Sequence, residues 1–305
     1  MPSINKTSPS KSTALEYTLT NDVLFKMLFR DYPDLLKHLV AELLKIPFDS
    51  IGSFTVKNPE MPPDSMLEKF CRLDIVMEVD GRLIDLEVQV EDEKNYPERC
   101  LYHWARLFSS GLPVGDNYST LPRTIVISIL AFSLFKCAGF HSEFKALEVK
   151  RHEELTDKMV LHFFELPKLP KVTNGSDGLK LWLALFNAKT EEELSNLITV
   201  GGTIMSQAVS AYRSVSASGE FKELERLRLR ARLDEANALS NARREEREKW
   251  QGVVAEKDAT LAEKDATLAE KDKTHAATLA EVNAVIAEQA AVIEKLMAQI
   301  SRDKP

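Results

Sequence analysis

Two runs of alternating apolar and polar residues, joined by Asp80-Gly81, constrain the fold of this chain more than any other feature. The stretch covers residues 70–91 and reads FCRLDIVMEVDGRLIDLEVQVE. Asp-Gly between alternating runs is the strongest short-range signal of a β-hairpin, because a two-residue type I′ turn needs a positive φ at both positions. With that turn, Val79 lies opposite Arg82, and Asp74 lies opposite Glu87.

The two faces of the predicted hairpin differ in polarity. Side chains alternate between the faces of a strand, so odd-numbered residues of the first strand share a face with even-numbered residues of the second. The opposite face carries four carboxylates, and like charges that face each other destabilise a strand pair. A divalent cation, Mg²⁺ or Mn²⁺, would compensate these charges because both ions prefer oxygen ligands. Two alternatives are a solvated acidic face and a one-residue register slip. The predicted core face comprises Leu73, Ile75, Met77, Val79, Ile84, Leu86, Val88 and Val90, and the four carboxylates are Asp74, Glu78, Asp85 and Glu87.

Length and composition place the chain among globular proteins. It has 305 residues, of which 44% are hydrophobic, enough for one large core or two domains. No apolar run approaches the roughly 20 residues that a membrane-spanning helix needs, so no membrane partner is expected. Residues 1–17 are polar and lack the apolar centre of a signal peptide, so we expect a disordered lead-in.

Cysteine usage and net charge narrow the class further. Cys71, Cys100 and Cys137 are an odd set without metal-ligand spacing, which favours buried structural thiols in a reducing cytoplasm over a zinc site. The formal net charge of -7 argues against a purely electrostatic DNA-binding protein. Contact with nucleic acid would need local basic patches or a bridging metal ion.

Further segments have the patterns of helices and strands. Residues 20–30 read as a helix with Thr20 or Asn21 as the N-cap and Asp22 in the first turn, where a carboxylate interacts favourably with the helix dipole. Residues 32–45 continue as a second amphipathic helix. Residues 123–130 form a near-continuous apolar run with β-branched residues, which predicts a central strand buried on both faces. The remaining predicted elements are strands at 140–149 and 158–166 and a helical section from 177 to about 215.

A helix beginning at Pro97 carries a basic and aromatic face. Its predicted core stripe is Leu101, Trp104, Ala105 and Phe108. Beside that stripe, three-and-four spacing brings together Arg99, Tyr102, His103 and Arg106. Such a face next to an acidic metal site could hold a phosphate backbone. The simpler alternative is a solvated face with Arg99 paired to the hairpin. The histidines show no paired spacing on one element, so we expect them in the core or on the surface and not as ligands.

Heptads fill the end of the chain. AEKDATL at 255–261 repeats at 262–268 and, in altered form, at 269–275. The last four heptads keep an apolar seam typical of a coiled coil, which predicts a homo-oligomer. Within the repeats, Asp258, Asp265 and Asp272 occupy one seam position and weaken it. The seam positions are Leu261, Leu268, Val282 and Leu296 in one register and Leu279, Ile286, Ile293 and Ile300 in the other.

The predicted hairpin, with Asp74 followed on the next strand by Glu87-x-Gln89, is similar to the active-site pattern of PD-(D/E)XK nucleases. More closely, the chain resembles the bacterial PD-(D/E)XK transposase-like family, also called Rpn recombination-promoting nucleases. The resemblance covers about residues 20–187. The segments that carry it are TNDVLFKMLF (20–29), RLDI (72–75), DGRLIDLEVQ (80–89), ERCLYHWARLFSSGL (98–112), RTIVISILAFSLF (123–135), FHSEF (140–144), HFFELPKLP (162–170) and LWLALF (181–186).

This resemblance implies a restriction-endonuclease-like α/β fold, with a mixed-sheet core and flanking helices, that cuts DNA with a divalent metal. Asp74 and Glu87 would be the metal ligands, and Gln89 stands where most members of the superfamily have lysine. Asp22 could supply a further acidic group. Arg99, Tyr102 and Arg106 are candidates for phosphate contacts. The expected organisation is a lead-in at 1–17, a nuclease-like domain with a helical end at 18–216, and a charged helical coiled-coil tail at 217–305.

Three functions compete for this sequence. The first is a metal-dependent DNA endonuclease that promotes recombination or DNA mobility, favoured by the Asp74 and Glu87 pair. The second is a degenerate nuclease fold that binds DNA or a partner protein without cutting, favoured by Gln89 and by the acidic net charge. The third is a transposase proper, which the lack of a recognisable DNA-binding module disfavours.

Overall fold

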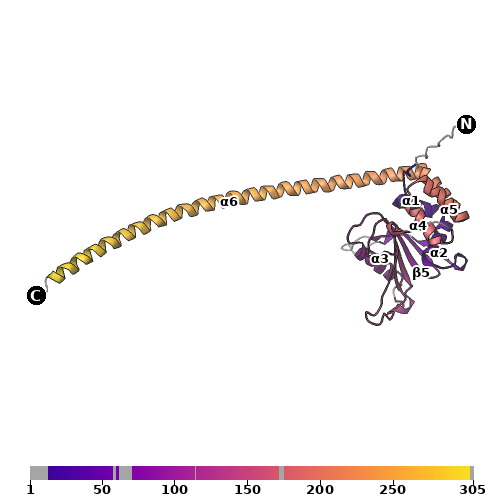
Figure 1. Ribbon diagram of the computed structural model, residues 1–305, viewed down its shortest axis with the longest axis horizontal. Coiled ribbons are helices and arrows are strands. Elements are labelled where there is room, and N and C mark those ends of the chain that lie inside the picture. The colour runs from indigo at the N-terminus through magenta and orange to yellow at the C-terminus, as the bar shows by residue number, and fades with distance from the viewer. Residues whose placement is uncertain (1–12, 58–59, 62–70, 114, 172–174, 303–305) are drawn as a thin grey trace, which may run out of the picture. The chain divides into compact units, whose positions relative to one another are not determined.

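The computed structural model describes residues 13–57, 60–61, 71–113, 115–171 and 175–302 (Figure 1). Contacts divide the chain into two compact units, residues 1–227 and 228–305. Most of the predicted disordered lead-in, residues 1–12, lies outside the described residues. The rest of it is ordered, because the Leu15 amide donates a 2.8 Å hydrogen bond to the Lys189 carbonyl and Tyr17 packs against the core.

A mixed sheet forms the centre of the first unit. In the described part of the chain it has six strands in the order β1-β4-β5-β6-β8-β7. β6 is parallel to β5 and to β8, and the other neighbours are antiparallel. The predicted α/β fold with a mixed-sheet core is therefore confirmed. The strands are β1 (Phe54–Lys57), β4 (Ile75–Val79), β5 (Arg82–Gln89), β6 (Thr124–Leu130), β7 (His141–Lys145) and β8 (Met159–Glu165), and β2 (Glu60–Met61) pairs separately with β3 (Cys71–Arg72).

The hairpin of β4 and β5 has the predicted register. Val79 pairs with Arg82 and Ile75 pairs with Leu86. The turn residues have positive φ, 48° at Asp80 and 74° at Gly81, which only a type I′ turn requires at both positions. Two residues of the predicted core face lie elsewhere. Leu73 precedes β4 and packs with Val76, Leu83 and Leu107 on the other side of the sheet, and Val90 follows β5 and is exposed.

Four helices and the main hydrophobic core cover one face of the sheet. They are α1 (Asp22–Asp31), α2 (Pro33–Leu44), α4 (Gly178–Asn187) and α5 (Glu191–Ala217). Asn21 caps α1 by accepting a 3.0 Å hydrogen bond from the Leu24 amide, as predicted. The first turn of α6 (Gly219–Arg302) also belongs to this core, because Phe221 is fully buried in it. Short 3₁₀ helices occupy Phe48–Ser50, Tyr118–Thr120 and Leu166–Lys168.

Helix α3 (Tyr96–Ser110) covers the opposite face of the sheet (Figure 1). Its predicted core stripe was wrong for Leu101 and Ala105, which are exposed, whereas Trp104 packs against the core on this face and Phe108 is partly buried. Residues 101 and 103 point to opposite sides of a helix, and it is His103 that faces Glu87 on the hairpin. The buried stripe is Tyr96, Cys100, His103 and Leu107.

The cysteines have different surroundings. Cys100 is buried, and burial raises the pKa of its thiol to about 12. Cys137 is exposed, so the prediction that all three thiols are buried was wrong for this residue. It lies in the loop between β6 and β7, after the segment whose Phe132, Leu134 and Phe135 pack against the core. The side chain of Cys71 lies outside the described residues.

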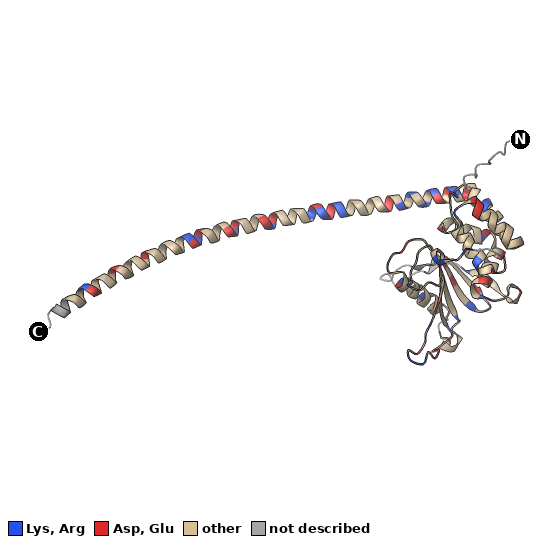
Figure 2. Cartoon of the chain, viewed as in Figure 1, with Lys and Arg blue, Asp and Glu red and all other residues tan. Residues whose placement is uncertain are grey.

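The second unit consists of the continuing helix α6. Acidic and basic residues are interspersed along it, as Figure 2 shows. Its apolar seam residues such as Leu279, Ile286 and Ile293 are each more than half exposed. An 18-residue window of α6 has a mean hydropathy of 1.3, so by length and composition alone this helix could cross a membrane. The absence of a membrane partner therefore stays a prediction.

Candidate active site

Asp74 lies directly before β4, and Glu87 lies opposite it near the end of β5. The Glu87 Oε1 accepts a 2.9 Å hydrogen bond from the Asp74 amide, and the Asp74 Oδ2 accepts a 3.0 Å hydrogen bond from the Val88 amide. Each carboxylate is thus held by the backbone of the opposite strand. The hairpin register predicted this contact: Ile75 pairs with Leu86, so the next position along places Asp74 opposite Glu87.

Both carboxylates are largely removed from water. The exposed fraction of the side chain is 16% for Asp74 and 8% for Glu87. Burial and then the neighbouring Glu87 raise the pKa of Asp74 to about 6, while Lys26 acts in the opposite direction. The two acids are therefore costly to keep ionised together, and a cation bound between them would relieve that cost.

Asp85 and His103 extend the acidic site beneath α3. Asp85 is fully buried on β5, one strand repeat before Glu87, and His103 is 9% exposed. The His103 Nδ1 lies 3.6 Å from the Glu87 Oε1. Asp85, Glu87 and His103 each offer a ligand atom, and these atoms lie within 4.8 Å of one another. Two ligands bound to one ion at about 2.1 Å lie roughly 3 to 4 Å apart, so a modest closure would complete a cation site.

A lysine on α1 reaches Asp74, one of these carboxylates. The Lys26 Nζ on α1 lies 2.8 Å from the Asp74 Oδ1 and 2.6 Å from the Asp22 Oδ1. The pKa of Lys26 is raised: burial would lower it, but the Asp74 and Asp22 carboxylates outweigh burial. Asp22 therefore joins the site through Lys26, as well as lying in the first turn of α1.

Gln89 points toward Arg99 and not toward Asp74. Its Oε1 accepts a hydrogen bond from the Arg99 Nη2, and its Nε2 donates a 2.9 Å hydrogen bond to the Glu91 carbonyl. Arg99 also pairs with Glu93 at 2.5 Å. The guanidinium predicted to contact phosphate is thus held to the end of the hairpin, which is the simpler alternative given by the sequence.

The other two predicted phosphate contacts remain on the α3 surface. Tyr102 is 37% exposed and Arg106 is partly buried. They lie on the helix that covers the site, so their predicted role is compatible with the fold and stays a prediction.

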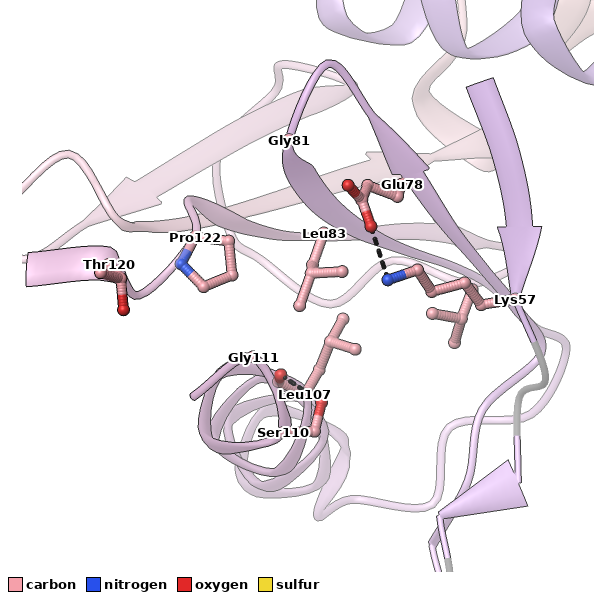
Figure 3. A pocket seen from close by; sticks show the side chains of 10 residues that line it. Lys57, Glu78, Gly81, Leu83, Leu107, Ser110, Gly111, Thr120 and Pro122 are labelled. Atoms are coloured by element: carbon pink, nitrogen blue, oxygen red, sulfur yellow. Dashed lines mark hydrogen bonds and ion pairs between the residues drawn. The ribbon is translucent and has the colours of Figure 1, made fainter. Parts of the chain in front are cut away.

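A cavity lies at the far end of the same hairpin, beside the turn (Figure 3). It measures about 410 Å³ and is lined by residues that include Leu83, Leu107 and Pro122. Its one ion pair joins the Lys57 Nζ to the Glu78 Oε2 at 2.5 Å. Among the described residues that line this cavity, Glu78 is the only carboxylate, so the pair provides a control for the site.

The sequence interpretation did not name Lys26, Asp85 or His103 as metal ligands or catalytic residues, although it counted Asp85 among the four carboxylates that a cation would compensate. Asp85 was visible as a carboxylate two residues before Glu87, and therefore on the same face of the strand. His103 was visible only as one of four residues on a helix face. Lys26 follows Asp22 by four residues, a spacing that predicts their pairing but not their approach to Asp74.

The arrangement fits a divalent cation of the hard class. Asp85 and Glu87 offer oxygen atoms and His103 a nitrogen, a donor set that suits Mg²⁺ and better still Mn²⁺. Asp74 lies beside Glu87 but outside this group of three. The assignment of metal ligands among these groups stays a prediction, and measurements of metal binding test it.

Comparison with known proteins bears on the family of the chain. No curated protein and no solved structure matches the chain. Residues 19–242, which include the sheet, the acidic hairpin and the start of α6, match the family described as PD-(D/E)XK nuclease family transposase. The match covers well over half of the chain. The chain therefore belongs to the PD-(D/E)XK nuclease family transposases.

Proposed function

We propose that this protein is a divalent-metal-dependent DNA endonuclease that promotes recombination or the movement of DNA. The observation that carries the proposal is the reciprocal attachment of Asp74 and Glu87, each held by a backbone amide of the other strand. Backbone hydrogen bonds fix both carboxylates before any ligand arrives, which reduces the cost of ordering them on binding. Membership of a nuclease family supports DNA as the substrate.

Asp74 and Glu87 would hold the metal ion, with Asp85 and His103 adjoining them. A cation bound there would supply charge opposite the phosphate and lower the pKa of a bound water molecule. The protein's own groups orient the site: the Asp74 and Val88 amides hold the two carboxylates, and α3 excludes water from one side.

Plasmid cleavage with Mg²⁺, Mn²⁺ or EDTA tests the proposal. We expect metal-dependent nicking that falls at least about a hundredfold in Asp74→Asn and Glu87→Gln, the size of loss seen when a charge-stabilising group is removed. Glu78→Gln is the matched control, because Glu78 lies on the same strand face but pairs with Lys57 at the far end of the hairpin. Mn²⁺ binding, followed by electron paramagnetic resonance, should weaken in the first two variants only.

Two results would contradict this function. Cleavage that survives both substitutions would remove Asp74 and Glu87 from the active centre. An unaltered protein that binds DNA but cuts with none of the metals would favour the alternative, a degenerate nuclease fold that acts in assembly. One observation favours that alternative: the Gln89 amide is engaged with Arg99 and with the backbone, and it brings no positive charge to the site.

Self-association through α6 is part of the proposed function. A helix whose apolar seam is more than half exposed gains stability when a second helix covers that seam. The occupant proposed here is a second copy of the same chain, because the heptads of one chain complement themselves in register. Two nuclease units joined in this way would be able to cut both strands of a duplex.

A further inference from the structure

Lys26 belongs to a cavity that opens beside the acidic pair. The cavity measures about 480 Å³, and its lining includes Asp22, Lys26, Arg30 and Asp74. Lys26 and Asp74 therefore border the same open space, in addition to their 2.8 Å contact. A ligand that reaches Asp74 through this cavity also meets the Lys26 ammonium, whose side chain is 29% exposed.

The strand that carries Glu87 brings no positive charge to this cavity. Gln89 is neutral, and both ends of its amide are engaged, with Arg99 and with the Glu91 carbonyl. Arg99 is itself held by Glu93. Lys26 instead arrives from α1, on the other side of the sheet, and its ammonium contacts Asp22 and Asp74.

Phosphodiester hydrolysis creates a need for such a charge. The oxygen of a water molecule bonds to phosphorus, the bond from phosphorus to one bridging oxygen breaks, and one proton of the water ends on the leaving oxygen and the other on the new phosphate or in solvent. Negative charge grows on the non-bridging oxygens in the transition state. A fixed hydrogen-bond donor aimed at that charge lowers the barrier, and removing one such donor typically costs 10²–10³ in rate.

We propose that Lys26 is a catalytic residue of the proposed nuclease: its ammonium, held between Asp22 and Asp74, donates a hydrogen bond to a non-bridging oxygen of the scissile phosphate. Lys26 keeps its own protons throughout and serves as a second positive charge besides the metal. This role rests on the proposed function, and it assigns to α1 a part of the active centre that the hairpin lacks.

The test combines single-turnover cleavage at saturating Mn²⁺ with direct measurement of Mn²⁺ affinity by electron paramagnetic resonance. The variants are Lys26→Met, which removes the charge, and Lys26→Arg, which keeps it. Lys57→Met is the matched control, because Lys57 also pairs with a hairpin carboxylate but lies at the cavity beside the hairpin turn (Figure 3). Thermal unfolding shows whether each variant is folded.

We expect Lys26→Met to cleave at least about a hundredfold more slowly, Lys26→Arg to recover most of that loss, and Lys57→Met to match the unaltered protein. Mn²⁺ affinity in Lys26→Met should be unchanged or tighter, because a positive charge has been removed from beside Asp74. A purely structural lysine would show the opposite result, weaker Mn²⁺ binding in parallel with slower cleavage, and that result would overturn the proposal.

Two further outcomes separate this inference from the proposed function. Cleavage within about threefold of the unaltered protein in a folded Lys26→Met variant would overturn the role of Lys26 and leave the nuclease intact. An unaltered protein that cuts with no metal would overturn the nuclease, and the role of Lys26 with it.

Discussion

His103 is the side chain whose position changes the interpretation of the site most. It was expected to be a core or surface residue, and it lies buried with its Nδ1 3.6 Å from the Glu87 Oε1. That separation is longer than a good hydrogen bond; it fits an ion pair if the imidazole is protonated, and it equally fits two ligands of one metal ion.

His103→Phe should therefore lower Mn²⁺ affinity at least about tenfold, since loss of a ligand or of its orienting partner typically costs 10- to 100-fold. Electron paramagnetic resonance titration of Mn²⁺ gives the affinity, and circular dichroism verifies the fold. Tyr102→Phe, a change at the neighbouring exposed position, should leave affinity unaltered. Equal affinity in all three proteins would leave the metal to Asp74 and Glu87 alone.

His162 on β8 offers a second measurement on a single side chain. It is 8% exposed, and its Nδ1 lies 3.0 Å from the His141 Nε2. Burial lowers the pKa of His162 to about 4; Glu143 acts in the opposite direction, and His141, Arg123 and Lys145 add to the lowering. The folded protein therefore holds this imidazole neutral at a pH where the unfolded chain binds a proton.

The sign of the resulting pH dependence follows from that difference. The contribution of His162 to stability is fully present above about pH 6.5 and is lost as the pH falls toward 4, by roughly 2–3 kcal/mol at pH 4.5. Urea unfolding of the unaltered protein and of His162→Phe at pH 7.5 and 4.5 measures it. The free energy of unfolding of the variant should fall less between the two pH values, and parallel decreases would contradict the prediction.

The sequence predicted the acidic pair because everything that aligns it is local. Asp80-Gly81 determines the turn, and the turn determines which residues of β4 and β5 face each other. Lys26 could not be placed in the same way, because its contact with Asp74 depends on how α1 docks over the edge of the sheet. His103 was missed for a related reason: the inner side of α3 follows the polarity of the sheet beneath it, and the helical pattern alone favours leucine.

At the scale of elements, α5 has one break that its sequence explains. Gly202 has φ 62° and ψ -147°, a conformation essentially confined to glycine, inside an otherwise helical stretch. The break lets the two parts of α5 bury separate apolar groups, Leu194 and Leu197 before it and Met205 and Val209 after it.

Gly202→Ala should destabilise the first unit by about 1–3 kcal/mol, although a Cβ there would meet no atom within 4 Å. The cost comes from the backbone conformation alone. Gly219→Ala is the matched control, because a Cβ at Gly219 also meets nothing within 4 Å and its φ is not positive. Chemical denaturation of both variants compares them, and an equal free energy of unfolding would show that α5 relaxes without a break.

Strands and helices were predictable in proportion to the strength of their periodicity. The near-continuous apolar segment at 123–130 became β6, and all seven residues of this strand are buried. The segment at 140–149 was expected to be one strand, and β7 ends at Lys145. It forms the edge of the sheet, where half-exposed residues give a weaker pattern.

At the scale of the whole molecule, the helix α6 has two different parts: its first turns pack in the core, and the rest carries an exposed apolar seam. Phe221 is buried in the core of the nuclease unit, and the compact unit extends to Leu227, past the expected boundary at 216/217. Composition changes near residue 217 and suggested that boundary, but composition does not reveal that the first turns of a charged helix bury an aromatic ring.

Charge placed in the apolar seam should prevent self-association. Ile286→Asp introduces a carboxylate at a seam position, and Ala284→Asp introduces the same group on the outer side of the same helix. Sedimentation equilibrium should give the unaltered chain and Ala284→Asp at least twice the mass of one chain, and Ile286→Asp the mass of one. A single-chain mass for the unaltered protein at tens of micromolar would contradict the proposed oligomer.

The hairpin of β4 and β5 makes the number of residues between Asp74 and Glu87 as important as their identity. The two residues are 13 positions apart, and the tight turn leaves no slack between them. Insertion or deletion of one residue near Gly81 would rotate one acid to the opposite face of the sheet without changing either side chain. Length changes in this segment are thus expected to abolish metal binding where many substitutions would be tolerated.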